Sequence, residues 1–188
     1  MSFVLCVCGM NFSVMMSDGR MISLPNNDIV AENVPKVIKF NKNVAMAYTG
    51  DPIPTQIAIK TLEKYNVHNF SMEEIEKIII EQLKMVDSNI LGVKIIFTGK
   101  NKDGAFVIHN IDSDNNYTIN ITYPRNEGIT FSCAGNDSDL CNQVIQDNFS
   151  NVIINKSEQL EYLMEKCICD VAKFDKTVNT NIYKVVVK

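Results

Sequence analysis

The sequence predicts an α+β fold in which two stacked antiparallel sheets lie between two pairs of helices, a four-layer αββα sandwich. The expected elements come in runs: strands, two helices, four strands, two helices and one strand. Such runs favour α+β layering over the alternation of single strands and helices that builds a parallel sheet. Two stacked sheets with helices on their outer faces are an arrangement that fits this order. No linker, repeat or low-complexity stretch divides the 188 residues. We therefore expect a single domain over residues 1–188.

The first quarter of the chain is predicted to form strands. Apolar runs separated by Gly9-Met10-Asn11 and by Asn41-Lys42 are typical of hairpins. Ser17-Asp18-Gly19 predicts a turn, because Asp and Gly accept turn conformations. The expected strands cover residues 3–9, 11–17, 36–40 and 43–49.

The pattern then changes to a helical period. Residues 52–65 predict a helix, with Pro54 tolerated only in its first turn. Ser71 and Glu74 have the spacing of a capping box, in which each side chain bonds the other residue's backbone amide. An apolar stripe follows them, so we expect a second helix over residues 71–88.

The second half of the chain repeats this order. Turn-forming sequences separate four expected strands, at residues 92–99, 104–110, 117–122 and 128–134. Two helices follow, over residues 136–148 and from Asn155 to Phe174, the latter with Glu158 at capping-box spacing. A strand at residues 182–187 closes the fold.

Charge and hydropathy exclude several classes of protein. The net charge is −4 and the basic residues are scattered, which argues against a nucleic-acid partner. No apolar run approaches the ~18 residues of a membrane span, and the N-terminus lacks the profile of a signal peptide. We expect a cytoplasmic protein with no membrane partner.

Cysteine and histidine give no sign of a metal site. None of the six cysteines forms a C-x-x-C motif, and in a cytosolic protein we expect them free and buried. His68 and His109 are the only imidazoles, and neither has a cysteine at ligand spacing. We expect no metal and no cofactor.

Ser2 is the first candidate for chemistry. If Met1 is removed, Ser2 carries a hydroxyl and a free α-amine, a nucleophile and a base in one residue. An α-amine has a pKa of roughly 7.7–8.0, close to the pH at which a general base works best. Taken alone, however, Ser2 is only a favoured second residue.

Three further motifs follow in order. Asp18-Gly19-Arg20 lies sixteen positions after Ser2, Lys36 opens an apolar segment, and Thr49-Gly50-Asp51 precedes the first expected helix. With these motifs and this element order, nearly the whole chain resembles the proteasome β-type subunits, a family that includes bacterial proteasome-like peptidases. The resemblance implies the αββα fold of N-terminal-nucleophile (Ntn) hydrolases. Lys36 comes slightly late, which implies a longer loop before it.

The resemblance also implies a role for each matched residue. Ser2 would form an acyl-enzyme while its amine carries the proton. Lys36, held near Asp18, would lower the proton affinity of the nucleophile, and Arg20 would support this cluster. The amide of Gly50, at a helix N-terminus, would donate to the developing oxyanion.

The late motifs depart from the family pattern. The nucleophile is Ser2 instead of threonine. Ala134 and Gly135 fall where the family has Gly-Ser-Gly, so a supporting hydroxyl is absent. Asp170 falls near the family's late aspartate and is a further catalytic candidate, with Lys173 where a second serine would be.

Three functions stay open from the sequence. The first is an Ntn hydrolase that cleaves peptides with Ser2, inside a homo-oligomer, possibly a ring, with a possible ATPase partner that the sequence does not show. The second is a catalytically inactive member that serves assembly or binding. The third is an Ntn amidase that acts on a small amide.

Overall fold

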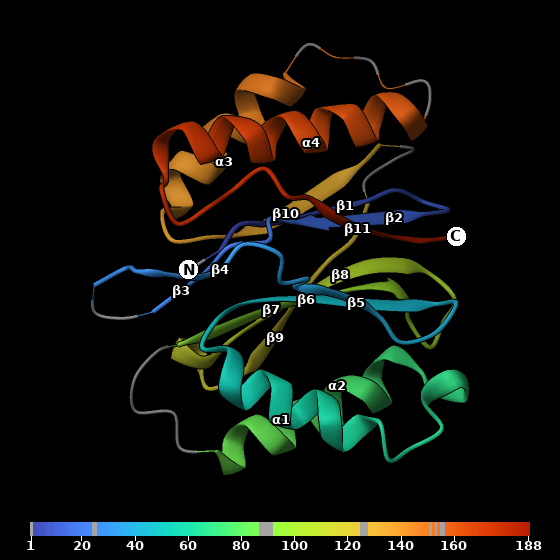
Figure 1. Cartoon of the computed structure of the whole chain (residues 1–188). Coiled ribbons are helices and arrows are strands. Elements are labelled where there is room, and N and C mark those ends of the chain that lie inside the picture. Colours follow the sequence, from blue (N-terminus) through green and yellow to red (C-terminus); the bar gives the residue numbers. More distant parts are fainter. Residues whose placement is uncertain are drawn as a thin grey trace.

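The computed structural model is a four-layer αββα sandwich, as predicted (Figure 1). It describes residues 2–23, 26–86, 92–124, 128–150, 152, 154 and 157–188. In Figure 1 two helices lie above one sheet, and the second sheet lies below it on the other two helices.

The first sheet has the strand order β10-β1-β2-β11, and every pair is antiparallel. Its strands are β1 (Val4–Cys8), β2 (Ser13–Ser17), β10 (Thr130–Ala134) and β11 (Tyr183–Val187). Both central strands are buried at every position, because helices cover one face of this sheet and the second sheet covers the other.

The second sheet is an antiparallel meander in chain order. Its strands are β5 (Val37–Lys39), β6 (Val44–Gly50), β7 (Val93–Lys100), β8 (Phe106–Asp112) and β9 (Thr118–Thr122). β9 forms one edge and its residues are largely exposed.

Two helices cover the outer face of the second sheet: α1 (Pro52–Leu62) and α2 (Met72–Met85), with a short 3-10 turn at Val67–Asn69 between them. The predicted capping box is present: Ser71 Oγ accepts from Glu74 N, and Glu74 Oε2 accepts from Ser71 N. The first helix ends three residues before the expected residue 65, because Tyr65 N bonds Leu62 O in a turn.

The first sheet is covered by α3 (Ser138–Phe149) and α4 (Ser157–Phe174). Asp137 caps α3 by accepting from the amides of Asp139 and Leu140. The expected start of the last helix at Asn155 lies outside the described residues. A second 3-10 turn, Ser113–Asn115, follows β8.

The sequence did not predict the hairpin of β3 (Met21–Ile22) and β4 (Ile29–Ala31). Its strands are two and three residues long, and Ile29 and Val30 are exposed, so no apolar alternation marks them. The hairpin occupies the long loop that the late position of Lys36 implied.

Three apolar layers fill the spaces between sheets and helices. One lies between the second sheet and α1 and α2, one between the first sheet and α3 and α4, and one between the two sheets. All six cysteines are free thiols, and burial raises the pKa of Cys8 to about 12, so this thiol stays protonated at neutral pH. Among the described helices, none has both the length and the apolar character to cross a membrane.

Candidate active site

A buried carboxylate organises the end of β2. Asp18 is fully buried, and its Oδ1 accepts hydrogen bonds from Phe3 N at 2.8 Å and from Lys36 Nζ at 2.9 Å. Its Oδ2 accepts from Arg20 N at 2.7 Å. The turn predicted from Asp18 and Gly19 therefore holds a charge whose donors come from three separate points of the chain.

Lys36 supplies the opposite charge. Its side chain is 5% exposed, and Nζ also donates to Arg20 O at 2.6 Å and to Asp18 O at 3.3 Å. Burial lowers the pKa of Lys36, and the carboxylate of Asp18 partly offsets this effect. All the acceptors around Nζ are oxygens, so the ammonium is satisfied although it is buried.

Ser2 lies directly beside this ion pair. Phe3 N donates to the Asp18 carboxylate, and Phe3 O accepts from Asp18 N at 3.1 Å, so both backbone groups after Ser2 are fixed. On the other side, a methyl group added to Gly135 would lie 3.6 Å from Ser2 O and 3.4 Å from the Phe3 ring. The structure thus brings Ser2, Asp18, Lys36 and Gly135 together.

Ala134 stands next to this cluster and carries only a methyl group. It pairs with Val4 in the β1–β10 ladder and is buried. The side chain at this position can neither donate nor accept a hydrogen bond.

Gly50 ends β6, whereas the sequence analysis expected it at the N-terminus of the first helix. Asp51 is the N-cap and accepts from Ile53 N, and α1 starts at Pro52. Gly50 has a φ of +94°, and a Cβ there would lie 1.9 Å from Gly92 O, so only glycine fits.

The amide of Gly50 faces the Lys36 side of β6. Asp51 N donates to Gly92 O on the β7 side, whereas Tyr48 N donates to Lys36 O on the other side. Backbone amides alternate along an antiparallel strand, so the Gly50 N–H has the direction of the Tyr48 N–H. The Gly50 N–H is therefore directed toward the β5 side of β6, and it belongs to a strand end instead of a helix N-terminus.

Arg20 has a structural role that the sequence did not reveal. Its guanidinium makes two hydrogen bonds to Glu32, at 3.1 and 3.0 Å, and donates to Lys176 O at 2.5 Å. Asn179 completes this latch, because its Oδ1 accepts from Gly19 N and its amide donates to Glu32. Bonds across roughly 150 residues leave no local sequence pattern.

The structure does not bring Asp170 to the cluster. Its carboxylate bonds Lys173 Nζ at 2.6 Å and Asn148 Nδ2 at 3.1 Å. Cys141, in the first turns of α3, lies against Gly135, whereas Asn148 lies seven residues further along α3, about 10 Å at 1.5 Å per residue. Asp170 therefore belongs to the outer helix layer.

Asp175 is a late carboxylate nearer to the cluster. Its Oδ1 accepts from Thr177 N at 2.8 Å and from Thr177 Oγ1 at 2.6 Å. Burial raises the pKa of Cys141 to about 12, with Cys133 and Asp175 adding to it. Asp175 lines one pocket with Asn136 and Leu140, the chain neighbours of Gly135 and Cys141. The sequence analysis missed it because it falls just beyond the last helix.

A family model described as proteasome subunit matches residues 2–187. The chain belongs to the proteasome subunit family. A comparison with curated protein sequences returned no match.

Two solved structures show the same proteasome fold. A Gly-1 mutant of Anbu from Hyphomicrobium sp. strain MC1 aligns with 100% of this chain and 82% of its own, at 13% identity and a TM-score of 0.74. Eukaryotic HslV from Trypanosoma brucei aligns over 99% of both chains, at 15% identity and a TM-score of 0.67. At these identities the likeness establishes the proteasome fold of the chain, and its chemistry must be argued from its own residues.

No group of three or more His, Cys, Asp or Glu side chains within the described part of the chain could hold a metal ion. The groups that the site offers for chemistry are a hydroxyl, an ion pair and backbone amides.

Proposed function

We propose that this proteasome-family protein is an Ntn hydrolase that cleaves peptide bonds with Ser2, once Met1 is removed. The observation that carries the proposal is the Asp18–Lys36 ion pair, which is buried and is bonded to the backbone of Phe3, one residue after Ser2. A buried ion pair costs desolvation free energy, and its position beside Ser2 gives it a chemical use.

In the proposed first step, Ser2 Oγ attacks the substrate carbonyl and its proton passes to the Ser2 α-amine. The positive charge of Lys36 favours the developing alkoxide, because an opposite charge nearby lowers the pKa of the hydroxyl. The Gly50 N–H, on the Lys36 side of β6, would donate to the oxyanion of the tetrahedral intermediate.

In the second step, the tetrahedral intermediate collapses and the carbon–nitrogen bond of the substrate breaks. The leaving amine takes the proton from the Ser2 ammonium, and an ester on Ser2 Oγ remains. A water molecule then attacks the ester, again with the α-amine as base. When the ester bond breaks, the ammonium returns this proton to Ser2 Oγ and the acid product leaves. Two steps of lower barrier replace one difficult hydrolysis.

A non-catalytic role in assembly or binding is the second candidate, and Ala134 favours it. Its methyl group leaves the position beside β1 without a hydroxyl that could orient the amine.

We also propose that copies of the chain assemble into a homo-oligomer, which light scattering on a sizing column would measure.

The test begins with the intact mass of untagged protein, which reports whether Met1 is absent. A panel of fluorogenic peptides and small amides is then assayed with wild type and Ser2→Ala. Ser13→Ala is the matched control, because Ser13 is a buried serine in the adjacent strand of the same sheet.

We expect peptide hydrolysis by wild type and by Ser13→Ala, and a loss of about 10³-fold or more in Ser2→Ala. Hydrolysis confined to small amides would assign an amidase. Activity that survives Ser2→Ala would refute the nucleophile, and inactivity of protein that lacks Met1 would favour the non-catalytic role.

A further inference from the structure

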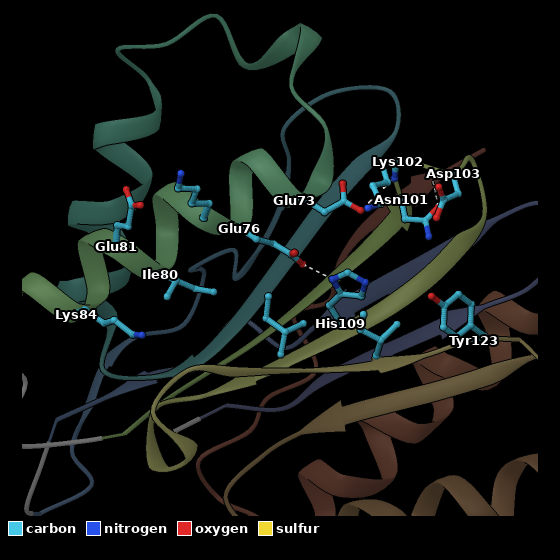
Figure 2. Close-up of a pocket in the computed structure, with 13 residues that line it drawn as sticks. Glu73, Glu76, Ile80, Glu81, Lys84, Asn101, Lys102, Asp103, His109 and Tyr123 are labelled. Atoms are coloured by element: carbon cyan, nitrogen blue, oxygen red, sulfur yellow. Dashed lines mark hydrogen bonds and ion pairs between the residues drawn. The ribbon is translucent and has the colours of Figure 1, made fainter.

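A pocket lies between α2 and the strands β8 and β9, and it shares no residue with the Ser2 cluster (Figure 2). Its volume is about 560 Å³. It is lined from one stripe of α2, from Glu73 to Lys84, and by side chains of the facing strands. The edge strand β9 is open here, so the pocket is reached from solvent.

A buried pair of titratable residues forms the base of this pocket. Glu76 Oε1 lies 2.7 Å from His109 Nδ1, and the two side chains are 1% and 4% exposed. Figure 2 shows Glu76 pointing from α2 toward His109, which comes from β8. His109 pairs directly with Ile121 in the β8–β9 ladder, so the floor of the pocket lies next to the apolar side chains of β9.

One oxygen of each of two carboxylates in this pocket lacks a donor. Glu76 Oε2 and Glu73 Oε2 are both buried and have no hydrogen-bond partner among the described residues. Glu73 Oε1 accepts a hydrogen bond from Lys102 N at 3.1 Å. A buried oxygen without a donor is costly, and such atoms in native proteins call for an explanation, such as an ion or ligand.

The remaining walls carry both apolar and charged side chains, and the latter include Lys77, Lys84 and Lys102. The apolar part of the lining consists of Ile80 of α2, Ile119 and Ile121 of β9, and Tyr123 just after this strand. These apolar surfaces suit an alkyl chain, whereas the two orphan oxygens suit a cation with several N–H donors. Burial raises the pKa of Glu76, and a bound cation beside it would act in the opposite direction.

We propose that this pocket binds a small aliphatic primary amine, with its ammonium group on the orphan oxygens of Glu76 and Glu73 and its alkyl chain along Ile80, Ile119 and Ile121. Charge-assisted hydrogen bonds hold the ammonium. Each methylene that enters the apolar walls strengthens binding by about fourfold, the equivalent of ~0.8 kcal/mol per CH₂. The site is independent of the chemistry of Ser2.

The test is a calorimetric titration of the purified full chain with n-pentylamine, with n-butylamine as the shorter homologue and 1-pentanol as the uncharged analogue. Glu76→Gln keeps the shape and removes the charge, and Glu165→Gln, on exposed α4 surface, is the matched control. Ile121→Lys is a second variant, and it should still fold because Ile121 is half exposed. The new lysine ammonium would compete with the amine for the pocket.

We expect saturable binding of pentylamine, tighter than butylamine, with pentanol and Glu76→Gln at least about tenfold weaker. Ile121→Lys should weaken binding as well, and Glu165→Gln should not. Equal binding by wild type, Glu76→Gln and Ile121→Lys would overturn the proposal, as would the absence of binding at millimolar amine. A parallel titration with Nα-acetyl-lysine amide distinguishes a free amine from a lysine side chain of a polypeptide. Tighter binding of this probe than of pentylamine would assign the pocket to a lysine side chain and overturn the proposal of a free amine.

Discussion

Replacement of Lys36 by methionine should destabilise the fold strongly. The change keeps most of the length of the side chain but leaves the Asp18 carboxylate, which is fully buried, without its cation. Removal of one partner from a buried ion pair costs on the order of 3–5 kcal/mol. Asp18 keeps its hydrogen bonds from the amides of Phe3 and Arg20, so we expect the lower end, about 3 kcal/mol. For a chain of this length that lowers Tm by about 6–12 °C.

Urea unfolding, followed by circular dichroism, measures this loss. Lys42→Met is the control, because Lys42 is exposed and its replacement should change the free energy of unfolding by no more than about 0.5 kcal/mol. The double variant Asp18→Asn with Lys36→Met should lose at least about 1 kcal/mol less than the sum of the single variants. Wild-type stability in Lys36→Met, or strict additivity in the double variant, would refute the role of the ion pair.

Three further predictions concern a strand end, the latch and the pocket. Gly50→Ala should lower the free energy of unfolding in urea by several kcal/mol, because its Cβ would lie 1.9 Å from a carbonyl oxygen. Gly104→Ala, at a φ of +79° with no heavy atom within 4 Å, should lower it by only about 1–2 kcal/mol. Equal losses would refute the steric argument. Arg20→Ala should speed amide hydrogen exchange at residues 176–181, because the latch opens, and unchanged exchange there would contradict it. Burial raises the folded-state pKa of Glu76 above its usual value. The stability of wild type relative to Glu76→Gln should therefore fall as the pH rises from about 4.3 through that raised pKa. Chemical denaturation at several pH values measures this difference, and a stability difference that increases with pH would contradict the prediction.

The fold was predictable because its signals are local and agree with one another. The capping box of Ser71 and Glu74 lies within four residues, and the structure shows both of its bonds. The short hairpin at β3 and β4 was not predictable, because five exposed or half-exposed residues carry no periodicity. Its pairing depends on the rest of the fold.

The site was predictable where spacing encodes it and not elsewhere. The distance from Ser2 to Asp18 reflects one complete hairpin, so both residues return to the same end of β1 and β2. Asn179 reaches Gly19 across the whole domain, and a bond between such distant residues has no signature in one sequence. Asp170 was misplaced because the helical pattern does not say which face of α4 meets α3.

The most direct test of the central claim is the location of an acyl group on the protein. Protein that lacks Met1 is incubated with an activated ester of a short peptide, quenched in acid, and mapped by tandem mass spectrometry. The proposed mechanism predicts an ester on residue 2 of wild type that hydroxylamine removes, retained in Ser13→Ala and absent from Ser2→Ala, whose free α-amine can form only a hydroxylamine-stable amide. A hydroxylamine-labile adduct that persists in Ser2→Ala, or its absence from wild type that hydrolyses the same ester, would contradict Ser2 as the nucleophile.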